Sequence, residues 1–358
     1  MSDPTGLAAW LRLSLVPGIG GESQRKLLAA FGLPEAVFAA GPLAARGVIG
    51  SRADLLFGHD SSDLVEQSLN WAAEPGNALV TLADAAYPPA LLEIPDPPIL
   101  LYLRGDLAHL QKRGLAIVGS RNATPQGCQT AESFARALAG QGLPIVSGLA
   151  LGIDAAAHRG ALKGGGPTIA VVGTGANRLY PAGNRDLALA ILEHGAILSE
   201  FPLGTPPLAA NFPRRNRLIA GLARGVLVVE AAPQSGSLIT ARLAAEQGRE
   251  VFAIPGSIHS PLARGCHQLI KQGAKLVETA ADILEEFRLP AVETPAAPAA
   301  AEGEEHPLIA ALGHDPCSLD ELATRTGLGA DRLLGELLSL ELAGRLACLP
   351  GNRYQRLA

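Results

Sequence analysis

The feature that most constrains the fold is a series of short apolar runs that alternate with helix-like stretches between residues 75 and 288. Such runs suit β-strands covered on both faces, and the stretches between them suit right-handed helical crossovers. The pattern predicts an α/β domain with a doubly wound, mostly parallel sheet that binds ligands at the carboxyl ends of its strands. The predicted strands are residues 116–118, 145–146, 168–172, 196–198, 226–229 and 251–253.

A smaller helical segment precedes the sheet region. Residues 1–72 alternate helix-like apolar spacing with Gly and Pro breaks, which predicts a small domain of the SAM or helix-hairpin-helix kind. A glycine-rich turn at residues 16–20 could meet a DNA phosphate through exposed amides. Only Arg25 and Lys26 supply positive charge nearby, so a structural turn is the favoured interpretation.

The sheet domain is predicted to cover residues 73–288 and to be followed by a linker at residues 289–306. The linker is rich in Pro and Ala and then acidic, with too little large apolar surface to fold. Residues 307–358 then predict a winged-helix-like module. Its signals are a capping-box spacing from Ser318 to Glu321, an amphipathic helix at 330–342 and a hairpin at 345–356 around Pro350-Gly351-Asn352.

The second helix of this module is acidic for a DNA-recognition helix. It carries Asp331, Glu336 and Glu341 against a single Arg332. A helix that reads the major groove needs cations and hydrogen-bond donors toward the duplex. Contact with another protein or a structural role is therefore favoured over duplex reading and over a transcription factor.

The overall charge restricts where nucleic acid could bind. The chain has 29 Lys and Arg against 34 Asp and Glu, a formal net charge of −5, so any such contact must be confined to a patch. The 4 cysteines are far apart and form no CxxC pair, so neither a zinc site nor a disulfide framework is expected, and no cofactor motif is present. Without an apolar run of bilayer length or a signal-peptide pattern, we expect a cytoplasmic protein with no membrane partner.

A basic run with one aromatic residue provides the patch. Residues 211–217 read Asn211-Phe212-Pro213-Arg214-Arg215-Asn216-Arg217. A guanidinium matches phosphate with a fixed fork of donors, and a phenylalanine ring offers a face for a base, which together suit single-stranded nucleic acid. The alternative is a helix whose arginines cover its surface while Phe212 fills the core.

Two glycine-containing loops suit phosphate as well. Gly119-Ser120-Arg121 follows a predicted strand and precedes a helix, and Ser235-Gly236-Ser237 does the same. Backbone amides and hydroxyls at a helix N-terminus bind anions. Neither a dinucleotide fingerprint nor a P-loop occurs. Three anion-binding segments on one side of a sheet suit a nucleic-acid strand better than one mononucleotide.

Four further residues could do acid–base chemistry or hold the structure together. Asp154 and His158 are spaced to share a helix face, but no Ser or Cys nucleophile is visibly coupled to them, which favours a structural hydrogen-bonded pair near the sheet edge. Glu200 and Glu230 each follow a predicted strand. They could be catalytic or could orient the arginines, and orientation needs fewer assumptions.

Taken together, these segments resemble the DprA/Smf family of DNA-processing proteins, which protect incoming single-stranded DNA during natural transformation and load RecA on it. The resemblance spans residues 75–288, and the flanking modules match the three-domain version of the family. The motifs that carry it are Tyr87-Pro88 with Leu91, Asp96-Pro97-Pro98, Leu101-Tyr102, Gly105, Ile117-Val118-Gly119-Ser120-Arg121, Ser147-Gly148-Leu149-Ala150, Gly152-Ile153-Asp154, Ala157-His158, Tyr180-Pro181, Ser199-Glu200, Phe212-Pro213 with Arg215-Asn216-Arg217, residues 235–240 and Ile254-Pro255-Gly256.

The resemblance implies an extended Rossmann-like domain that forms a homodimer, binds single-stranded DNA in a basic pocket and hands it to the RecA recombinase. It implies Arg121, Arg215 and Arg217 as phosphate ligands, Phe212 as a base-stacking ring and the Ser235/Ser237 loop as a donor of hydrogen bonds. The full set of DNA-binding residues predicted here is Gly119, Ser120, Arg121, Phe212, Arg214, Arg215, Asn216, Arg217, Ser235, Gly236 and Ser237. Leu151 and His267 depart from the Arg and Asn that many members have at these positions.

An enzymatic alternative is a phosphoribohydrolase acting on nucleoside monophosphates, which uses a similar sheet and a P-G-G-x-G-T-x-x-E loop. The equivalent residues 235–240 are followed by no Glu until Glu246. The missing acid disfavours hydrolysis, so the sequence predicts a non-enzymatic binder without a cofactor.

Overall fold

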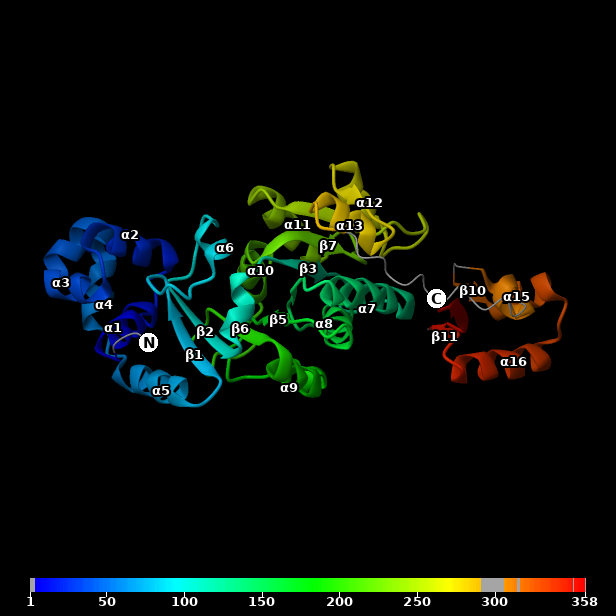
Figure 1. The fold of residues 1–358 in the computed structure, drawn as a ribbon, viewed down its shortest axis with the longest axis horizontal. Coiled ribbons are helices and arrows are strands. Elements are labelled where there is room, and N and C mark those ends of the chain that lie inside the picture. The colour runs from blue at the N-terminus through cyan, green and yellow to red at the C-terminus, as the bar shows by residue number, and fades with distance from the viewer. Residues whose placement is uncertain (1–3, 291–305, 314–315, 350, 358) are drawn as a thin grey trace.

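A computed structural model describes residues 4–290, 306–313, 316–349 and 351–357. A helical module lies at one end, the sheet domain in the middle and a small module at the other end (Figure 1). Within the described residues the large sheet has nine strands in the order β1-β2-β6-β5-β4-β3-β7-β8-β9. The strands are β1 (Asn77–Thr81), β2 (Leu100–Gly105), β3 (Gly114–Val118), β4 (Ile145–Ser147), β5 (Thr168–Val171), β6 (Ala196–Ser199), β7 (Ala223–Val228), β8 (Glu250–Ala253) and β9 (Lys275–Leu276).

The predicted fold class is confirmed by this sheet. Strands β3 to β9 pair in parallel, and only β1 and β2 add antiparallel pairings, β1 with β2 and β2 with β6. The six predicted strands coincide with β3 to β8. The strand order runs backward from β6 to β3 and then forward from β7, so the topology switches between β3 and β7. Ligands of open α/β sheets bind beyond the carboxyl ends of the strands at such a point.

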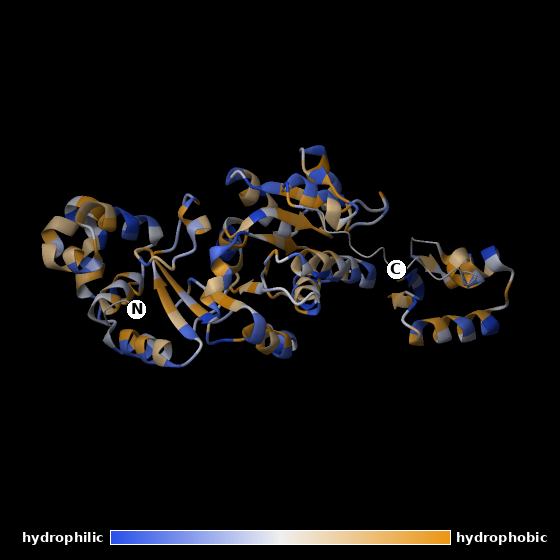
Figure 2. Ribbon diagram, viewed as in Figure 1, coloured by the Kyte–Doolittle hydropathy of each residue, from blue (hydrophilic) through white to orange (hydrophobic). Residues whose placement is uncertain are grey.

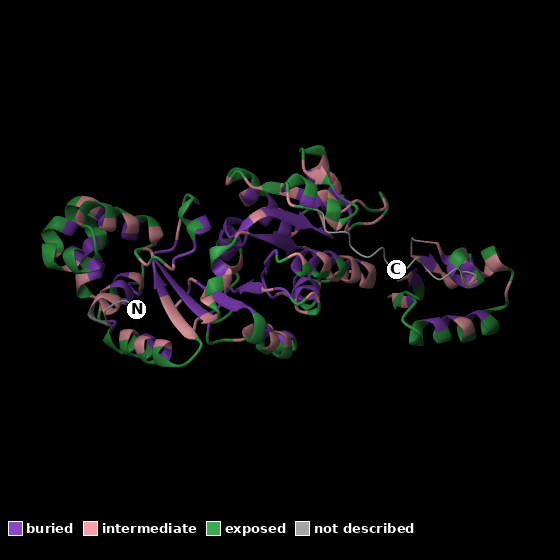
Figure 3. Ribbon diagram, viewed as in Figure 1, coloured by how far each residue is buried: buried purple, intermediate pink, exposed green. Residues whose placement is uncertain are grey.

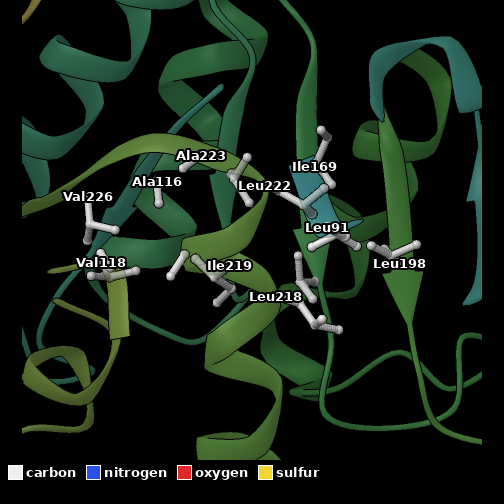
Figure 4. Close-up of a cluster of buried hydrophobic side chains, with 14 of the residues drawn as sticks. Leu91, Ala116, Val118, Ile169, Leu198, Leu218, Ile219, Leu222, Ala223 and Val226 are labelled. Atoms are coloured by element: carbon white, nitrogen blue, oxygen red, sulfur yellow. The ribbon is translucent and has the colours of Figure 1, made fainter. Parts of the chain in front are cut away.

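Helices cover both faces of the sheet. Successive side chains of a strand point to opposite faces, so strands that are apolar throughout need cover on both sides. Ala116 and Val118 face the layer that includes α10 (Asn211–Gly221), α11 (Gly236–Glu246) and α12 (Arg264–Lys271). Figure 4 shows this cluster, with Ile219 of α10 on the side of Val118 and Leu218 on the side of Leu91.

The alternate residues Leu115 and Ile117 face the opposite layer, made by α7 (Pro125–Gly140), α8 (Ile153–Lys163) and α13 (Ala280–Glu286). The helix α9 (Arg185–His194) packs on the same sheet beside β5 and β6. The central strands are accordingly buried along most of their length (Figure 3).

The N-terminal module packs on the antiparallel edge of the sheet. Trp10 and Leu27 share one apolar cluster with Leu100 and Tyr102 of β2, and the rings of Trp71 and Tyr102 lie 5.9 Å apart. No single helix of the described residues is long and apolar enough to cross a membrane. The segments Gly21–Phe31 and Pro34–Gly58, joined at a 95° bend, reach that length and apolar composition only as a pair. The helices are α1 (Pro4–Ser14), α2 (Gly21–Phe31), α3 (Pro34–Ile49), α4 (Ala53–Gly58), α5 (Ser62–Ala73) and, beyond β1, the short α6 (Pro89–Leu92).

The glycine-rich turn before α2 is held from within the module. Gln24 is buried and donates from Nε2 to the carbonyl oxygens of Leu13 (3.3 Å) and Ile19 (3.0 Å). Both nearby cations are paired as well, Lys26 with Glu22 and Arg25 with Asp96. The turn therefore has the contacts of a structural element.

The C-terminal module has a core of its own and the order of a winged helix. Ser318 and Glu321 form the predicted capping box, and the following helices α15 (Leu319–Thr326) and α16 (Ala330–Leu342) pack on a three-stranded sheet in the order β10-β12-β11. The exposed face of α16 mixes polar and apolar residues (Figure 2). The other elements are α14 (Pro307–Leu312), β10 (Cys317–Ser318), β11 (Leu346–Leu349) and β12 (Arg353–Arg356). Most of the predicted linker and Pro350 of the hairpin lie outside the described residues.

Candidate nucleic-acid interface

The loops that follow β3 and β7 meet at the topological switch point. The amide of Ser120 donates to the carbonyl oxygen of Glu230 (2.7 Å). The Glu230 carboxylate accepts from the amide (2.9 Å) and hydroxyl (2.6 Å) of Thr124, which caps the N-terminus of α7. Burial raises the pKa of Glu230, whereas these two hydrogen bonds favour its charged form. Glu230 thus fixes the segment 119–124 against the end of β7.

A cavity of about 730 Å³ opens above this junction. It gathers the three anion-binding segments named from the sequence, with the exception of Asn211, Arg214 and Arg217. Asp154 and Tyr180, which the predicted DNA-binding set omits, also line it. The predicted residues that line it are Gly119, Ser120, Arg121, Phe212, Arg215, Asn216, Ser235, Gly236 and Ser237.

The helix α10 explains why its arginines separate. Residues three or four apart lie on the same helix face. Phe212, Arg215 and Asn216 therefore point to one side and line the cavity, while Arg214 and Arg217 point to the other side and line a different recess. A basic run that looks continuous in sequence becomes two sites in space.

Arg121 and two aromatic rings form the open part of the cavity. Arg121 is exposed, and its guanidinium carbon lies 5.4 Å from the centre of the Phe212 ring. The rings of Phe212 and Tyr180 are 6.0 Å apart and tilted by 41°, so they form one aromatic wall. The ring of Phe212 lies against Gly173, where a Cβ would come within 3.0 Å of Phe212 Cδ1. Phe212 is only partly buried and belongs to none of the apolar clusters found among the described residues.

Arg215 lies at the bottom of the cavity and is 4% exposed. Its guanidinium donates to the carbonyl oxygens of Gly148 (2.8 Å) and Val171, at the ends of β4 and β5. A Cβ at position 148 would overlap that guanidinium, so any side chain there would displace Arg215 from this position. Burial lowers the pKa of Arg215 to about 10, which still leaves the group charged at neutral pH. Arg215 therefore holds two loops in place and adds a fixed positive charge beneath the cavity.

Asp154 and His158 lie in separate hydrogen-bond networks. Asp154 accepts from the amides of Gly148 (3.1 Å) and Ala150 (3.4 Å), and burial raises its pKa. His158 is fully buried and bonds through Nδ1 to the hydroxyl of Thr168 (2.7 Å), and burial lowers its pKa to about 3. The prediction of a hydrogen-bonded Asp154–His158 pair is therefore wrong, because burial gives each residue its own partners, and each stabilises a loop or strand end.

The N-terminus of α11 supplies the third side. Ser235 caps the helix, its hydroxyl lies 2.7 Å from that of Ser237, and the amide of Ser237 donates to it (3.3 Å). Asn216 reaches across from α10 and donates to the carbonyl oxygen of Gly236 (3.3 Å). The positive end of the helix dipole therefore faces the same space as Arg121.

The outer face of α10 is tied to carboxylates. Arg214 pairs with Glu200 (3.1 Å), and Arg217 pairs with Glu200 and with Asp96 (3.4 Å to Oδ2). Arg217 is 9% exposed and its guanidinium is bound to carboxylates, so it has no free pair of donors for phosphate. Glu200 therefore orients arginines, as the sequence predicts, whereas Glu230, for which the same role is predicted, binds Thr124 instead.

The sequence predicts only one of the two rings of the aromatic wall, that of Phe212. Tyr180 belongs to the Tyr-Pro motif that helps to carry the resemblance, yet nothing in the sequence places it beside Phe212, 32 residues later. The two departures lie at the periphery of this region. Leu151 is 49% exposed, and His267 bonds through Nε2 to the carbonyl oxygen of Gly256 (3.0 Å).

Comparison with known proteins matches most of the chain to described families. Residues 78–288 match the family model of DNA recombination-mediator protein A, and residues 292–352 match the DprA winged helix domain. Protein Smf of Escherichia coli K12 is 46% identical over 305 residues, which are 82% of this chain and 81% of that protein.

Two solved structures give the same picture in three dimensions. DNA processing protein A from Streptococcus pneumoniae superposes with a TM-score of 0.68 at 40% identity, covering 76% of this chain and 95% of that one. DNA processing protein A from Helicobacter pylori, whose structure was reported for its unique single-stranded DNA binding mode, gives a TM-score of 0.54 at 32% identity, covering 59% and 95%. These matches confirm the resemblance that the sequence motifs indicated.

Proposed function

Since the chain belongs to the DNA recombination-mediator protein A family, the DprA/Smf proteins, we propose that it binds single-stranded DNA without sequence specificity in the cavity between β3, β7 and α10. The proposal extends to delivery of that DNA to the RecA recombinase during DNA uptake, and to a homodimer formed through the sheet domain. The relative from Helicobacter pylori, reported for its single-stranded DNA binding mode, supports the ligand class.

One observation carries this proposal. The cavity combines an exposed arginine, a two-ring aromatic wall and a helix N-terminus within one space. We assign Arg121, Gly236 and the hydroxyls of Ser235 and Ser237 to phosphate, Phe212 and Tyr180 to base stacking, and Gly119 and Ser120 to the loop that presents Arg121. Arg215 and Asn216 then shape the bottom of the cavity. Arg214 and Arg217 lie on the opposite face of α10 and contribute to the cavity only indirectly, by holding this helix in place.

Preference for single strands is the first expected result. Bases stacked inside a duplex cannot present a face to Phe212 or Tyr180, whereas an unpaired strand can. We expect single-stranded DNA to bind well ahead of a duplex of the same sequence, with little change when its base composition is altered. Titrations of both forms across a salt series measure this. Equal affinity for the duplex would contradict the proposal.

Hydrolysis of nucleotides is the alternative that this geometry supports less. The nearby carboxylates are already engaged, Glu230 by Thr124 and Asp154 by two backbone amides. A general acid or base must reach a reacting atom, and these groups instead hold loops. Incubation with a panel of nucleoside monophosphates is expected to release no free base, and steady release would replace the binding proposal with an enzymatic one.

The C-terminal module is expected to be dispensable for single-strand binding. It has its own apolar core, and the cavity residues all belong to the part of the chain before it. A chain that stops at Pro290 keeps Leu289, which packs on the core of the sheet domain. We expect it to stay folded and to retain most of the affinity of the full chain.

Circular dichroism and titration of the shortened chain provide the measurement. In the full chain the module contacts the sheet domain through a hydrogen bond from Gln355 to Gln126 of α7 (2.6 Å). The variant Gln126→Ala in the full chain is the matched control for that contact alone. Loss of binding in the shortened chain with an intact sheet domain would assign a main DNA contact to the module.

A further inference from the structure

The ion pairs behind α10 continue beyond the sheet domain. The Glu200 side chain is 2% exposed and bonds to both Arg214 and Arg217. Arg217 also donates to the main-chain oxygen of Asp96 and pairs with its carboxylate. Asp96 therefore contacts α10 through its carboxylate oxygen Oδ2, which leaves the other oxygen, Oδ1, for a second partner.

That second partner belongs to the N-terminal module. Arg25 of α2 pairs with Asp96 Oδ1 through Nη1, which also donates to the carbonyl oxygen of Pro97 (3.0 Å). The Arg25 side chain is 22% exposed, so solvent screens this pair only in part. An unbroken chain of charged contacts thus runs from α2 through Asp96 and Arg217 to α10.

The apolar packing around these charged contacts couples the position of the N-terminal module to that of α10. The N-terminal module shares one apolar cluster with Ile99 and Leu100, which directly follow the Asp96-Pro97-Pro98 segment. At its C-terminal end α10 packs closely on the segment that precedes Asp96, because a Cβ at Gly221 would come within 2.7 Å of Ile94. The segment 94–100 is therefore held by the N-terminal module on one side and by α10 on the other.

A displacement of α10 would move side chains that line the cavity. A helix is stiff over three turns, and α10 carries Phe212 and Arg215 on its cavity face and Arg217 on its outer face. The ring of Phe212 is in close contact with Gly173, so a small shift of the helix changes the aromatic wall. Stacking and phosphate contacts depend on such positions to within about 0.5 Å.

We infer that Arg25 is a positioning residue for the cavity, which places the N-terminal helical module in control of its affinity for single-stranded DNA through Asp96, Arg217 and α10. This inference rests on the proposed function and adds a role for a module none of whose described residues lines the cavity. A partner that binds the module and separates Arg25 from Asp96 would loosen the hold on DNA without entering the cavity.

The test compares two arginines of the same module in the full-length protein. Arg25→Ala removes the link to Asp96, whereas Arg46→Ala removes the exposed Arg46–Asp54 pair (2.6 Å), which is separate from this network. Coupling between sites typically amounts to fivefold or more in affinity, so Arg25→Ala is expected to raise the Kd for single-stranded DNA by about fivefold. Arg46→Ala is expected to leave it unchanged.

The salt dependence separates positioning from direct contact. A residue that binds phosphate releases counterions, so its loss lowers the log–log slope by roughly 0.7 on single strands. Arg25→Ala is expected to leave the slope unchanged and to lose its effect in a Phe212→Ala background, because both changes then act on the same wall. Arg25→Lys returns a cation to Asp96 and is expected to recover most of the affinity.

Three results would overturn the inference. They are an unchanged Kd in Arg25→Ala, a reduced salt slope that makes Arg25 a phosphate ligand, or full additivity with Phe212→Ala. If Arg25→Ala does not fold, the folded variants Arg25→Lys and Asp96→Ala are compared instead. The inference is overturned if Arg25→Lys does not bind single-stranded DNA more tightly than Asp96→Ala. In each case the loss of affinity in Arg121→Ala shows independently whether the proposed function holds.

Discussion

Replacing Arg121 with alanine is expected to weaken single-stranded DNA binding by about 1.5–3 kcal/mol, roughly ten- to a hundredfold, for every sequence tested. Arg121 is the exposed guanidinium of the cavity, whereas Arg215 is buried beneath it and Arg217 is bound to carboxylates behind α10. The same substitution is expected to lower the log–log salt slope by roughly 0.7, because one phosphate contact is lost. Titrations between low and moderate salt measure both quantities.

The fold should survive this substitution. Arg121 lies on an exposed loop, and its backbone neighbours are held by the Glu230–Thr124 contacts. Arg136→Ala provides a matched control, since Arg136 is an exposed arginine three turns along α7, away from the cavity. Arg121→Lys should keep most of the salt slope while losing part of the affinity, because lysine keeps the charge without the fork. A normal slope in Arg121→Ala would remove this residue from the list of phosphate ligands.

The sheet was predictable to the extent that its strands are buried on both faces. Strands β3 to β8 read as apolar runs because helices cover them on each side. Strands β1 and β2 were not predicted. The edge strand β1 begins with Asn77 and its first three residues are only partly buried, so it does not read as such a run, whereas β2 is apolar and mostly buried and was nevertheless missed. The two residues of β9 are too few to give any pattern.

The candidate site was predictable in its loops but not in the direction of its side chains. Gly119-Ser120-Arg121 and Ser235-Gly236-Ser237 follow strands on either side of the switch point, so their proximity follows from the topology once the strand order is known. The strand order itself depends on contacts between residues far apart in sequence. The same limit applies to Glu200 and Asp96, whose pairing with Arg217 joins segments 17 and 121 residues apart.

Helix periodicity contained part of the missing information. On the helix of the alternative interpretation, the spacing of three or four residues groups Phe212 with Arg215 and Asn216, and Arg214 with Arg217. Which face meets the cavity is decided by the neutralising carboxylates, since a buried guanidinium needs partners. Residues 211–217 do lie on a helix, but Arg215 and Arg217 are buried and serve the structure, and Phe212 lies outside the apolar core. Nucleic-acid binding by this run stays a prediction.

Replacing Phe212 with alanine is expected to cost about 1–3 kcal/mol of single-strand binding and to leave the salt slope unchanged, because stacking releases no counterions. The ring is partly exposed, lies on Gly173 and faces Tyr180, so its removal leaves the main core intact. The melting temperature should consequently change little. Base-sensitive fluorescence of a strand carrying 2-aminopurine should also lose the change that accompanies binding.

A wholly buried phenylalanine supplies the contrast for this prediction. Phe252 is 0% exposed and packs in the core beneath α7, so Phe252→Ala is expected to cost about 3–5 kcal/mol of folding free energy. Thermal melts beside DNA titrations thus distinguish the two roles, with Phe212→Ala affecting affinity and Phe252→Ala affecting stability. A large fall in melting temperature for Phe212→Ala with affinity retained would make Phe212 a core residue, and the aromatic wall would then have no part in holding a base.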